Sequence, residues 1–336
     1  MQDLNITLAH GNGGRLMREL IEEVFARHLG NDYLDTNADA VALPLNDAAG
    51  EMVITTDGFT VQPLEYPGGN IGSLAIHGTG NDLAVAGATP HYFTLNVFIE
   101  EGLEVEVLER VLAGMAAAAK ALQVQIVAGD TKVVRRGEGG GLYLATTGVG
   151  TRQPGTRLAI DRIMCGDAVL VSGPIGDHGI AVMLAREQFG LRGELRSDEA
   201  SVLPLTSALI SLPGLRFMRD PTRGGLATVA HEIARGTGAT VRLRQADIPV
   251  RDQVQSVCKM LGYDPYYLAC EGRVVAVISP DNADEVLTLW KSLPEGKHAA
   301  RIGSVETGPA RVVLETELGG ERFLEELEDD PLPRIC

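Results

Sequence analysis

The first half of the chain alternates between two kinds of hydrophobic pattern. Residues 51–57, 124–130 and 142–149 alternate between apolar and polar positions and are rich in β-branched side chains, which predicts strands. Residues 71–88 and 103–122 carry apolar residues at intervals of three and four, which predicts helices. This succession is typical of a mixed αβ domain.

The second half repeats the style of the first. The pattern predicts a strand at 168–172, a helix at 180–189 after a Gly-rich turn, and a helix at 199–211 between loops at 193–197 and 212–219. The elements expected after these are a helix at 222–236 and strands near 240–243 and 273–279. Two similar halves predict an α/β, mixed α+β fold with two domains.

The two ends of the chain lack this regular pattern. Residues 1–50 hold a Gly-rich stretch at 10–14 followed by a helical pattern. Residues 317–336 are acidic, and Pro331 and Pro333 prevent a continuous helix, so we expect an extended, flexible tail. The expected division of the chain is therefore 1–50, 51–155, 156–316 and 317–336.

The composition limits the partners of the protein. With 336 residues and 45% hydrophobic content, the chain can bury two cores. It has 45 acidic and 29 basic residues, so the net charge of -16 would repel nucleic acid. The same charge opposes nucleotide phosphates, so any ATP site needs bridging metal ions or a local group of cations and backbone N–H donors.

The cysteines and the N-terminus indicate the cellular compartment in which the protein works. Neither a CxxC pair nor a spacing typical of zinc sites or disulfide frameworks is present, which suits a reducing cytoplasm. The N-terminus lacks a basic region followed by an apolar core, and no apolar stretch approaches the length of a bilayer span. We expect a soluble, cytoplasmic protein that does not bind membranes.

Three carboxylates adjoin predicted strands and helices: Asp57 in TTDGF, Asp82 in GTGND and Asp130 in AGDTK. Each could simply form a turn or cap a helix, since Gly, Thr or Asn stands beside it. Taken together in so acidic a chain, they favour shared coordination of Mg²⁺, which prefers a few carboxylates plus phosphate oxygens.

Two basic residues could contact phosphate. Lys132 lies two residues beyond Asp130, and Arg223 precedes Gly224 and Gly225 at the start of a predicted helix, where backbone N–H groups attract anions. The DPTRGG segment could equally be a Pro-led turn that begins the helix. No segment matches GxxxxGK[ST], and no GxGxxG separates a strand from a helix, so P-loop and Rossmann sites are excluded.

Glu271 and Cys336 are candidates for covalent and proton-transfer chemistry. Glu271, in YLACEGRVV, is either a shielded carboxylate with a raised pKa that serves as a base, or a solvated glutamate at a strand end. An acidic terminus with prolines is usually a solvated end without a role, but here it finishes in Cys336. The neighbouring α-carboxylate should make that thiol a poor spontaneous nucleophile, suited to loading by a partner.

Nine segments, taken in order, are similar to the HypE family of hydrogenase maturation proteins, in the superfamily of aminoimidazole ribonucleotide synthetase and selenophosphate synthetase. Segments such as GTGND and GDTKVV are shared across the ATP-binding superfamily, whereas a terminal PRIC is specific to the HypE family. The resemblance covers essentially the whole chain and implies an aminoimidazole ribonucleotide synthetase-like fold and a homodimer with joined N-terminal sheets. The segments are LAHGNGG, TTDGF, PGGNIG, GTGNDLAVAGA, GDTKVV, GDHG, DPTRGG, CEGRVV and PRIC.

The resemblance also implies an ATP-dependent carbamoyl dehydratase. The carbamoyltransferase HypF would load Cys336, ATP would phosphorylate the carboxamide oxygen, and loss of phosphate would leave a thiocyanate. The HypC–HypD scaffold complex would then carry the cyanide to the iron of a [NiFe]-hydrogenase. By motif position, Lys132 and Glu271 would act on the carboxamide, and Mg²⁺–ATP would be held by Asp57, Asp82, Asp130, Gly13, Gly14, Thr131, Arg223 and Gly224.

The chain departs from the family pattern at Gly58, where Ser is expected, and at His77, where Cys is frequent. His77 and His178 show no HxxxH pairing and are expected to make ordinary polar contacts. A selenophosphate synthetase would carry a reactive Cys near its N-terminus, and none precedes Cys165. Another ATP-dependent enzyme of the superfamily, either a selenophosphate synthetase or a kinase of a small metabolite, and a non-catalytic adaptor with a docking tail remain as alternatives.

Overall fold

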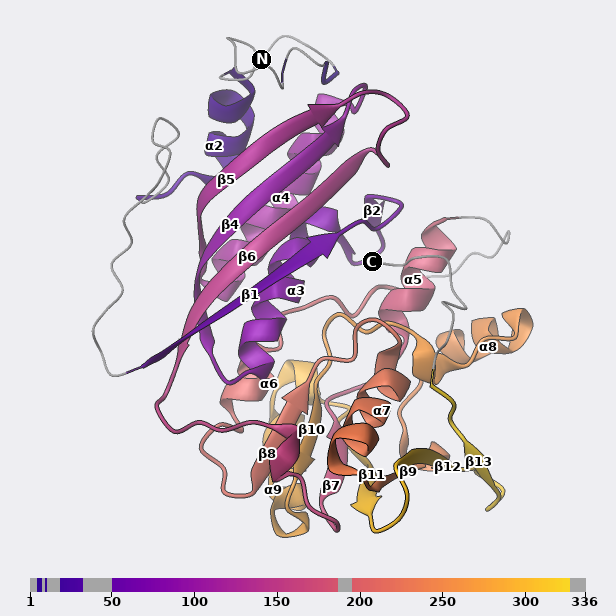
Figure 1. The fold of residues 1–336 in the computed structure, drawn as a ribbon. Coiled ribbons are helices and arrows are strands. Elements are labelled where there is room, and N and C mark those ends of the chain that lie inside the picture. Colours follow the sequence, from indigo (N-terminus) through magenta and orange to yellow (C-terminus); the bar gives the residue numbers. More distant parts are fainter. Residues whose placement is uncertain (1–4, 8–9, 11–18, 33–49, 187–194, 327–336) are drawn as a thin grey trace. The chain divides into compact units, whose positions relative to one another are not determined.

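The computed structural model describes residues 5–7, 10, 19–32, 50–186 and 195–326 of the chain. These residues form two compact units (Figure 1). The first consists of the described residues up to Leu83 together with Ala88–Pro154, and the second of Ala84–Gly87 and the described residues from Gly155 onward. Both units combine helices with a sheet, which confirms the mixed α/β class. No described helix is both long and apolar enough to cross a membrane.

The first unit is built on a four-stranded sheet. Its described elements are η2 (Ile21–Phe25), α2 (Ala26–Leu29), β1 (Glu51–Phe59), β2 (Glu65–Tyr66), β3 (Gly69–Asn70), α3 (Ile71–Val85), β4 (Thr89–Glu100), α4 (Val105–Leu122), β5 (Gln125–Val134) and β6 (Leu142–Arg152). The strand order is β1-β6-β4-β5, with β4 and β5 parallel and the other pairs antiparallel. Because parallel neighbours need a crossover, α4 connects β4 to β5.

The two faces of this sheet differ in burial. Alternate residues of β4 from Phe93 to Ile99 are buried, as expected for a strand with one face on a core. The hydroxyl of Thr146 in β6 donates to the carbonyl of Ala75 in α3 at 3.2 Å, so the buried side is the one that α3 covers. We call this side the helix face and the opposite side, which carries the exposed Phe98, the open face.

The second unit is built on a seven-stranded sheet with the order β13-β12-β9-β11-β7-β10-β8, in which only β9 and β12 pair in parallel. Its strands are β7 (Ala168–Val171), β8 (Leu215–Arg219), β9 (Thr240–Arg244), β10 (Val275–Ile278), β11 (Ala300–Glu306), β12 (Arg311–Glu315) and β13 (Glu321–Phe323). Its helices are α5 (Asp177–Ala185), α6 (Leu203–Ser207), α7 (Gly225–Thr237), α8 (Asp252–Leu261) and α9 (Ala283–Ser292), with short turns η3 (Ile160–Arg162), η4 (Gln245–Asp247), η5 (Pro265–Tyr267), η6 (Pro280–Asn282) and η7 (Pro294–Gly296).

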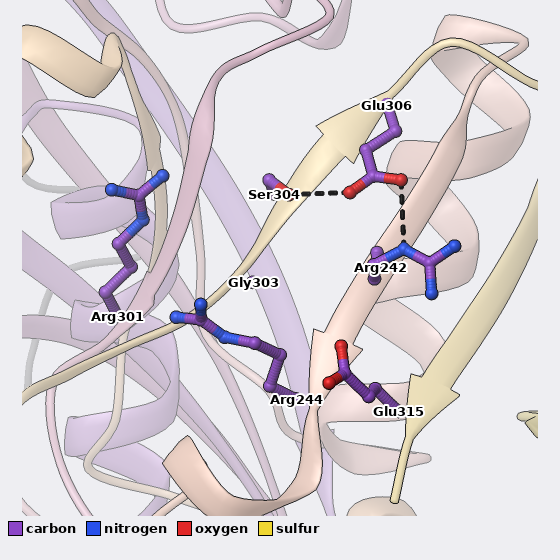
Figure 2. A pocket seen from close by; sticks show the side chains of 7 residues that line it. All are labelled: Arg242, Arg244, Arg301, Gly303, Ser304, Glu306 and Glu315. Carbon is purple, nitrogen blue, oxygen red and sulfur yellow. Dashed lines mark hydrogen bonds and ion pairs between the residues drawn. The ribbon is translucent and has the colours of Figure 1, made fainter. Parts of the chain in front are cut away.

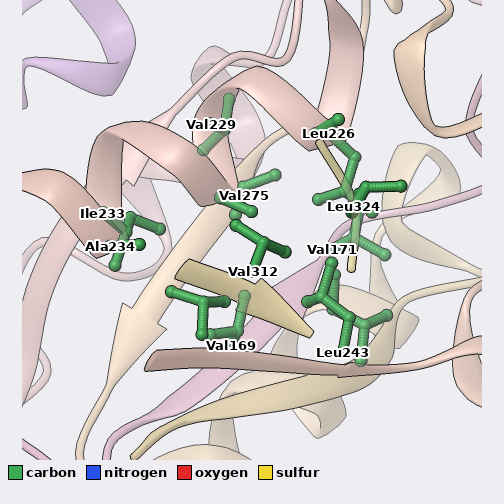
Figure 3. Packing of buried hydrophobic residues seen from close by; sticks show 14 of the residues in the cluster. Val169, Val171, Leu226, Val229, Ile233, Ala234, Leu243, Val275, Val312 and Leu324 are labelled. Carbon is green, nitrogen blue, oxygen red and sulfur yellow. The ribbon is translucent and has the colours of Figure 1, made fainter. Parts of the chain in front are cut away.

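Two hydrophobic clusters hold this second sheet. Figure 3 shows the first, in which Leu226 and Ile233 of α7 pack with Val169 and other strand residues. The second cluster contains buried residues of α6 and α9, including Leu205 and Trp290, whose indole N–H donates to the Leu205 carbonyl at 3.0 Å. Alternate residues of β7 belong to different clusters, so the two clusters lie on opposite faces of the sheet.

Two sequence expectations in the second unit are wrong. Residues 212–219, expected as a loop, contain β8, whose Leu215, Phe217 and Met218 are buried. The strand has only five residues, and Phe217 and Met218 are buried in succession, so it is recognisable only from its pairing with β10. The helix expected over 199–211 is reduced to α6, because Pro204 lacks an N–H and suits only the first turn of a helix.

Candidate active site

Asp57 and Asp82 lie on the helix face of the first unit. Asp57 pairs opposite Thr146 across β1 and β6, and its Oδ1 accepts the N–H of Gly58 at 2.8 Å. Asp82 belongs to α3, and its Oδ2 accepts the hydroxyl of Thr55 at 2.8 Å. Thr55 and Asp57 are two residues apart on one strand, so their side chains point to the same face. The two carboxylates are therefore neighbours on that face.

Asp130 and Lys132 lie on the open face. Thr131 between them is buried, and its backbone N–H donates to Asp130 Oδ1 at 2.9 Å. Lys132 Nζ lies 2.8 Å from Asp130 Oδ2, with both side chains about half exposed. An ion pair at this exposure contributes little to stability, roughly 0–1 kcal/mol, so phosphate oxygens can replace the carboxylate on the ammonium at low cost.

The three carboxylates do not meet within one subunit. Asp57 and Asp130 stand on the two outer strands of the sheet and point to opposite faces, about 14 Å apart for three strand spacings. The described residues contain no group of three His, Cys, Asp or Glu side chains arranged to hold a metal ion. Strand order thus separates Asp57 from Asp130 within one chain, and shared Mg²⁺ coordination by the three carboxylates stays a prediction.

The start of α7 places Arg223 and Gly224 beside the segment that leads to Glu271. Gly224 and Gly225 have φ of 71° and 57°, which favours glycine, and a Cβ on Gly225 would lie 2.5 Å from the carbonyl oxygen of Leu268. Arg223 itself is exposed. The segment thus forms the expected turn and also presents the Arg223 guanidinium to solvent, where an anion can bind.

Glu271 is buried in the second unit. It lies in a bend four residues before β10 and is 4% exposed, so it is not the solvated glutamate of the alternative interpretation. Its backbone N–H donates to Asp198 Oδ1 at 3.3 Å, and the N–H of Gly272 donates to Oδ2 of the same carboxylate at 3.4 Å. Asp198 was not identified from the sequence, where it is one acidic residue in a polar run.

The buried cysteines are poor nucleophiles. Burial raises the pKa of the Cys258 thiol to about 12. Burial also raises the pKa of Cys270 well above its usual value, and the Asp198 carboxylate adds to this effect. Since the thiolate is the reactive form, neither thiol suits covalent catalysis at neutral pH. Cys165 is the exposed cysteine of the described residues.

The beginning of the expected tail is anchored rather than flexible. Within 317–336, β13 pairs with β12, and Leu324 is buried in the α7 cluster. The hydroxyl of Tyr267 in η5 donates to the carbonyl of Glu325 at 2.7 Å, and the His231 ring in α7 bonds the Leu324 carbonyl at 2.7 Å. The packed part of the second unit therefore extends to these contacts, because the apolar Leu324 continues the core.

The remaining expected residues fall into two groups. Gly13, Gly14 and Cys336 lie outside the described residues, and their roles stay predictions. At Gly58, an added Cβ would meet nothing within 4 Å, so the family's serine would fit there. His77 is half-buried in α3.

A polar pocket of about 250 Å³ lies on the sheet of the second unit, and none of the described site residues lines it (Figure 2). Arg242 is paired with Glu306 at 2.9 Å and with Glu321 at 2.6 Å, and Arg244 with Asp247 at 2.5 Å. Charges that neutralise one another in this way leave little attraction for a ligand. The lining residues are Arg242, Arg244, Arg301, Gly303, Ser304, Glu306 and Glu315.

Comparison with known proteins gives consistent matches. The family models "AIR synthase related protein, N-terminal domain" and "AIR synthase related protein, C-terminal domain" match residues 37–152 and 165–315. Carbamoyl dehydratase HypE of Azotobacter vinelandii is 43% identical, over 99% of this chain and 97% of that protein. A crystal structure of HypE in complex with ATP has a TM-score of 0.92 and 41% sequence identity, and the match covers 98% of this chain and 99% of that chain. A crystal structure of a HypE–HypF complex has a TM-score of 0.80 and 41% sequence identity, and the match covers 92% of this chain and 99% of that chain.

Proposed function

Because this chain belongs to the HypE family of AIR synthase related proteins, we propose that it is an ATP-dependent carbamoyl dehydratase. It dehydrates a carbamoyl group on Cys336 to a thiocyanate, the source of the cyanide ligand of [NiFe]-hydrogenase. The observation that carries this proposal is the identity of 43% with a carbamoyl dehydratase over nearly the full length of both chains. A HypE relative has been crystallised with HypF, which supports HypF as the transferase that loads Cys336.

The proposed dehydration of the carbamoyl group proceeds in two steps. The carboxamide oxygen first takes the γ-phosphoryl group of ATP while the nitrogen gives up one proton, which yields a phosphorylated imidate and ADP. The carbon–oxygen bond then breaks, phosphate departs, and the nitrogen loses its second proton to complete the C≡N bond. Lys132 polarises the carboxamide oxygen with its ammonium, and Glu271 accepts a proton from nitrogen.

The acidic residues fit a magnesium nucleotide by their chemistry. Asp57 and Asp82 present neighbouring carboxylates on the helix face, and hard oxygen donors of this kind suit Mg²⁺. The ion would neutralise charge on the transferring phosphoryl group. Arg223 and Gly224 at the start of α7, together with Gly13, Gly14 and Thr131, would hold the nucleotide phosphates. Each of these assignments is supported by motif position and donor type.

A second copy of the chain would bring the strands that carry Asp57 and Asp130 side by side. The open face exposes Met52, Ile54 and Phe98 to 63%, 65% and 42%, a pattern typical of an interface. β1 and β5 are the outer strands of their sheet, and outer strands tend to pair or be covered. Joining β1 of one subunit to β5 of its partner gives a homodimer in which Asp57 and Asp130 come from different chains.

Mixing two inactive variants tests this arrangement. Asp57→Ala and Asp130→Ala subunits, unfolded together and refolded, should recover about a quarter of wild-type dehydration, since half of the dimers are mixed and each mixed dimer has one intact site. Mixtures of either variant with itself serve as controls. If the mixed dimers regain no activity, Asp57 and Asp130 do not come from different subunits of one site, and the proposed arrangement is wrong.

Loss of a carboxylate should weaken nucleotide binding through loss of magnesium. Asp82→Asn keeps an acceptor for Thr55 but removes the charge, so we expect ATP affinity to fall at least ~10-fold, about 1.4 kcal/mol, and to recover partly at high magnesium. Calorimetric titration with ATP at two magnesium concentrations measures this. Asp161→Asn, in an exposed pair with Arg157, is the matched control. Unchanged affinity in Asp82→Asn would make the residue only a hydrogen-bond acceptor for Thr55.

ATP turnover separates the proposed function from its rivals. Protein carbamoylated on Cys336 should release phosphate from ATP in one-to-one amount with thiocyanate, whereas bare protein should release little. Equal turnover by both forms would indicate a kinase of a small metabolite, and none by either would indicate an adaptor. A cytoplasmic location and delivery through HypC–HypD belong to the same proposal.

A further inference from the structure

A buried polar cluster surrounds the backbone of Glu271. It contains two carboxylates, Asp177 and Asp198, whose side chains are 2% and 0% exposed. Two guanidinium groups balance them, because Arg251 Nε lies 2.8 Å from Asp177 and Arg273 Nε lies 3.4 Å from Asp198. Charges buried in this way are stable only when paired and hydrogen-bonded.

Asp198 contacts the candidate base, Glu271, through hydrogen bonds to its backbone. Its Oδ1 accepts the N–H groups of Glu271 at 3.3 Å and of His178 at 3.1 Å. Its Oδ2 accepts the N–H of Gly272 at 3.4 Å. The N–H of Ala200 donates in return to the carbonyl of Glu271 at 3.5 Å. One carboxylate thus accepts hydrogen bonds from two consecutive backbone amides, at the position where the Glu271 side chain branches from the backbone.

Packing on both sides limits any other arrangement of this backbone. A Cβ on Gly272 would lie 1.9 Å from the carbonyl oxygen of Asp198, so the two segments are in direct contact. On the other side of Glu271, the N–H of Cys270 donates to the carbonyl of Pro221 at 3.0 Å. The backbone that carries the Glu271 side chain is therefore held on both sides, by Asp198 and by Pro221.

Arg273 fixes Asp198 in turn. Its Nε donates to the carbonyl of Pro174 at 2.8 Å, and its guanidinium faces both Asp198 at 3.4 Å and Asp177 at 3.6 Å. A planar guanidinium with several donors can hold two carboxylates and a carbonyl at once.

We propose that Asp198 is a positioning residue for Glu271, which keeps the carboxylate of Glu271 in place for proton transfer without itself touching the substrate. This inference rests on the proposed role of Glu271. Misplacement of a catalytic group by about 1 Å costs up to roughly 100-fold in rate, so a small shift of this backbone is enough to be measured.

The test is Asp198→Asn in the full-length protein. The variant keeps the volume but replaces one acceptor oxygen with an NH₂ group that faces backbone donors. Single-turnover dehydration of protein preloaded on Cys336 should slow roughly 10- to 100-fold, while ATP affinity and loading by HypF stay within about twofold.

Asp167→Asn is the matched control for stability. Asp167 is 2% exposed, accepts the N–H of Met164 at 2.8 Å and lies 3.5 Å from Arg216, but it precedes β7, at the opposite end of that strand from the residues that pair near Glu271. Both variants should lose stability, and only Asp198→Asn should lose rate. Equal losses of rate in both would overturn the proposal.

A double variant distinguishes positioning from a separate role. If Asp198 acts through Glu271, then Asp198→Asn combined with Glu271→Gln should be no slower than Glu271→Gln alone. Additive losses would show that Asp198 acts elsewhere, and a normal rate in Glu271→Gln would remove the base assignment and the positioning role together. Arg273→Lys, which keeps the charge, should show a smaller loss by the same route and replaces Asp198→Asn if that variant does not fold.

Discussion

Replacing Cys336 with alanine is expected to abolish thiocyanate formation while leaving ATP binding unchanged. In the proposed reaction the thiol sulfur of Cys336 carries the carbamoyl group, so no other residue can replace it. The buried cysteines do not substitute for it, because burial raises the pKa of both Cys258 and Cys270. The core of the second unit, as far as it is described, ends at Leu324, so the melting temperature should change by no more than about 2 °C.

Cys165→Ala is the control for this experiment, since it removes an exposed thiol from the second unit. It should retain full activity and full loading by HypF. Thiocyanate formed by the Cys336 variant, or lost in the Cys165 variant, would contradict the assignment of the acceptor. A large loss of thermal stability in the Cys336 variant would contradict the view that residue 336 adds little to either core.

Replacing Glu271 with glutamine is expected to slow dehydration by about 10²–10⁴-fold, the usual effect of removing a general base. Glutamine keeps the shape and hydrogen-bonding capacity of glutamate but cannot accept the proton from the carboxamide nitrogen. The variant should still be loaded on Cys336 and should bind ATP with nearly normal affinity. Rapid-quench measurement of phosphate release from the preloaded protein gives the rate.

Glu232→Gln is the matched control, because Glu232 is a partly buried glutamate of the same unit, paired with Arg219 at 3.0 Å. It should retain a rate within about threefold of the parent, as substitutions away from an active site usually shift energies by no more than roughly 0.5 kcal/mol. A similarly small effect in Glu271→Gln would leave Lys132, water or the substrate phosphate as the base.

The sequence predicts strands where burial follows a simple alternation. β1, β5 and β6 were expected from their β-branched residues and lie within a few residues of the predicted ranges. β4 has the same alternation from Phe93 to Ile99 and could have been predicted, whereas the short β8 could not, because Met218 is buried directly after Phe217 and breaks the alternation. Local patterns therefore reveal strands with one clean buried face and miss those defined by their partners.

The candidate site shows the same limit. Motifs identify Asp57 and Asp130 as chemically suitable, but the strand order and the face to which each points arise only from the folded sheet. Asp198 has no local signal, since only burial against Glu271 and Arg273 distinguishes it from a surface aspartate. Residue types indicate the chemistry, and tertiary pairing determines which residues can act together.

The most direct test of the central claim is the mass of the intact protein after incubation with HypF, carbamoyl phosphate and ATP. We expect a gain of one carbamoyl group before this protein's own ATP site turns over, followed by loss of one water when that site acts. Fragmentation should place both changes on Cys336. A modification on any other residue, or a carbamoyl group that never loses water, would contradict the account.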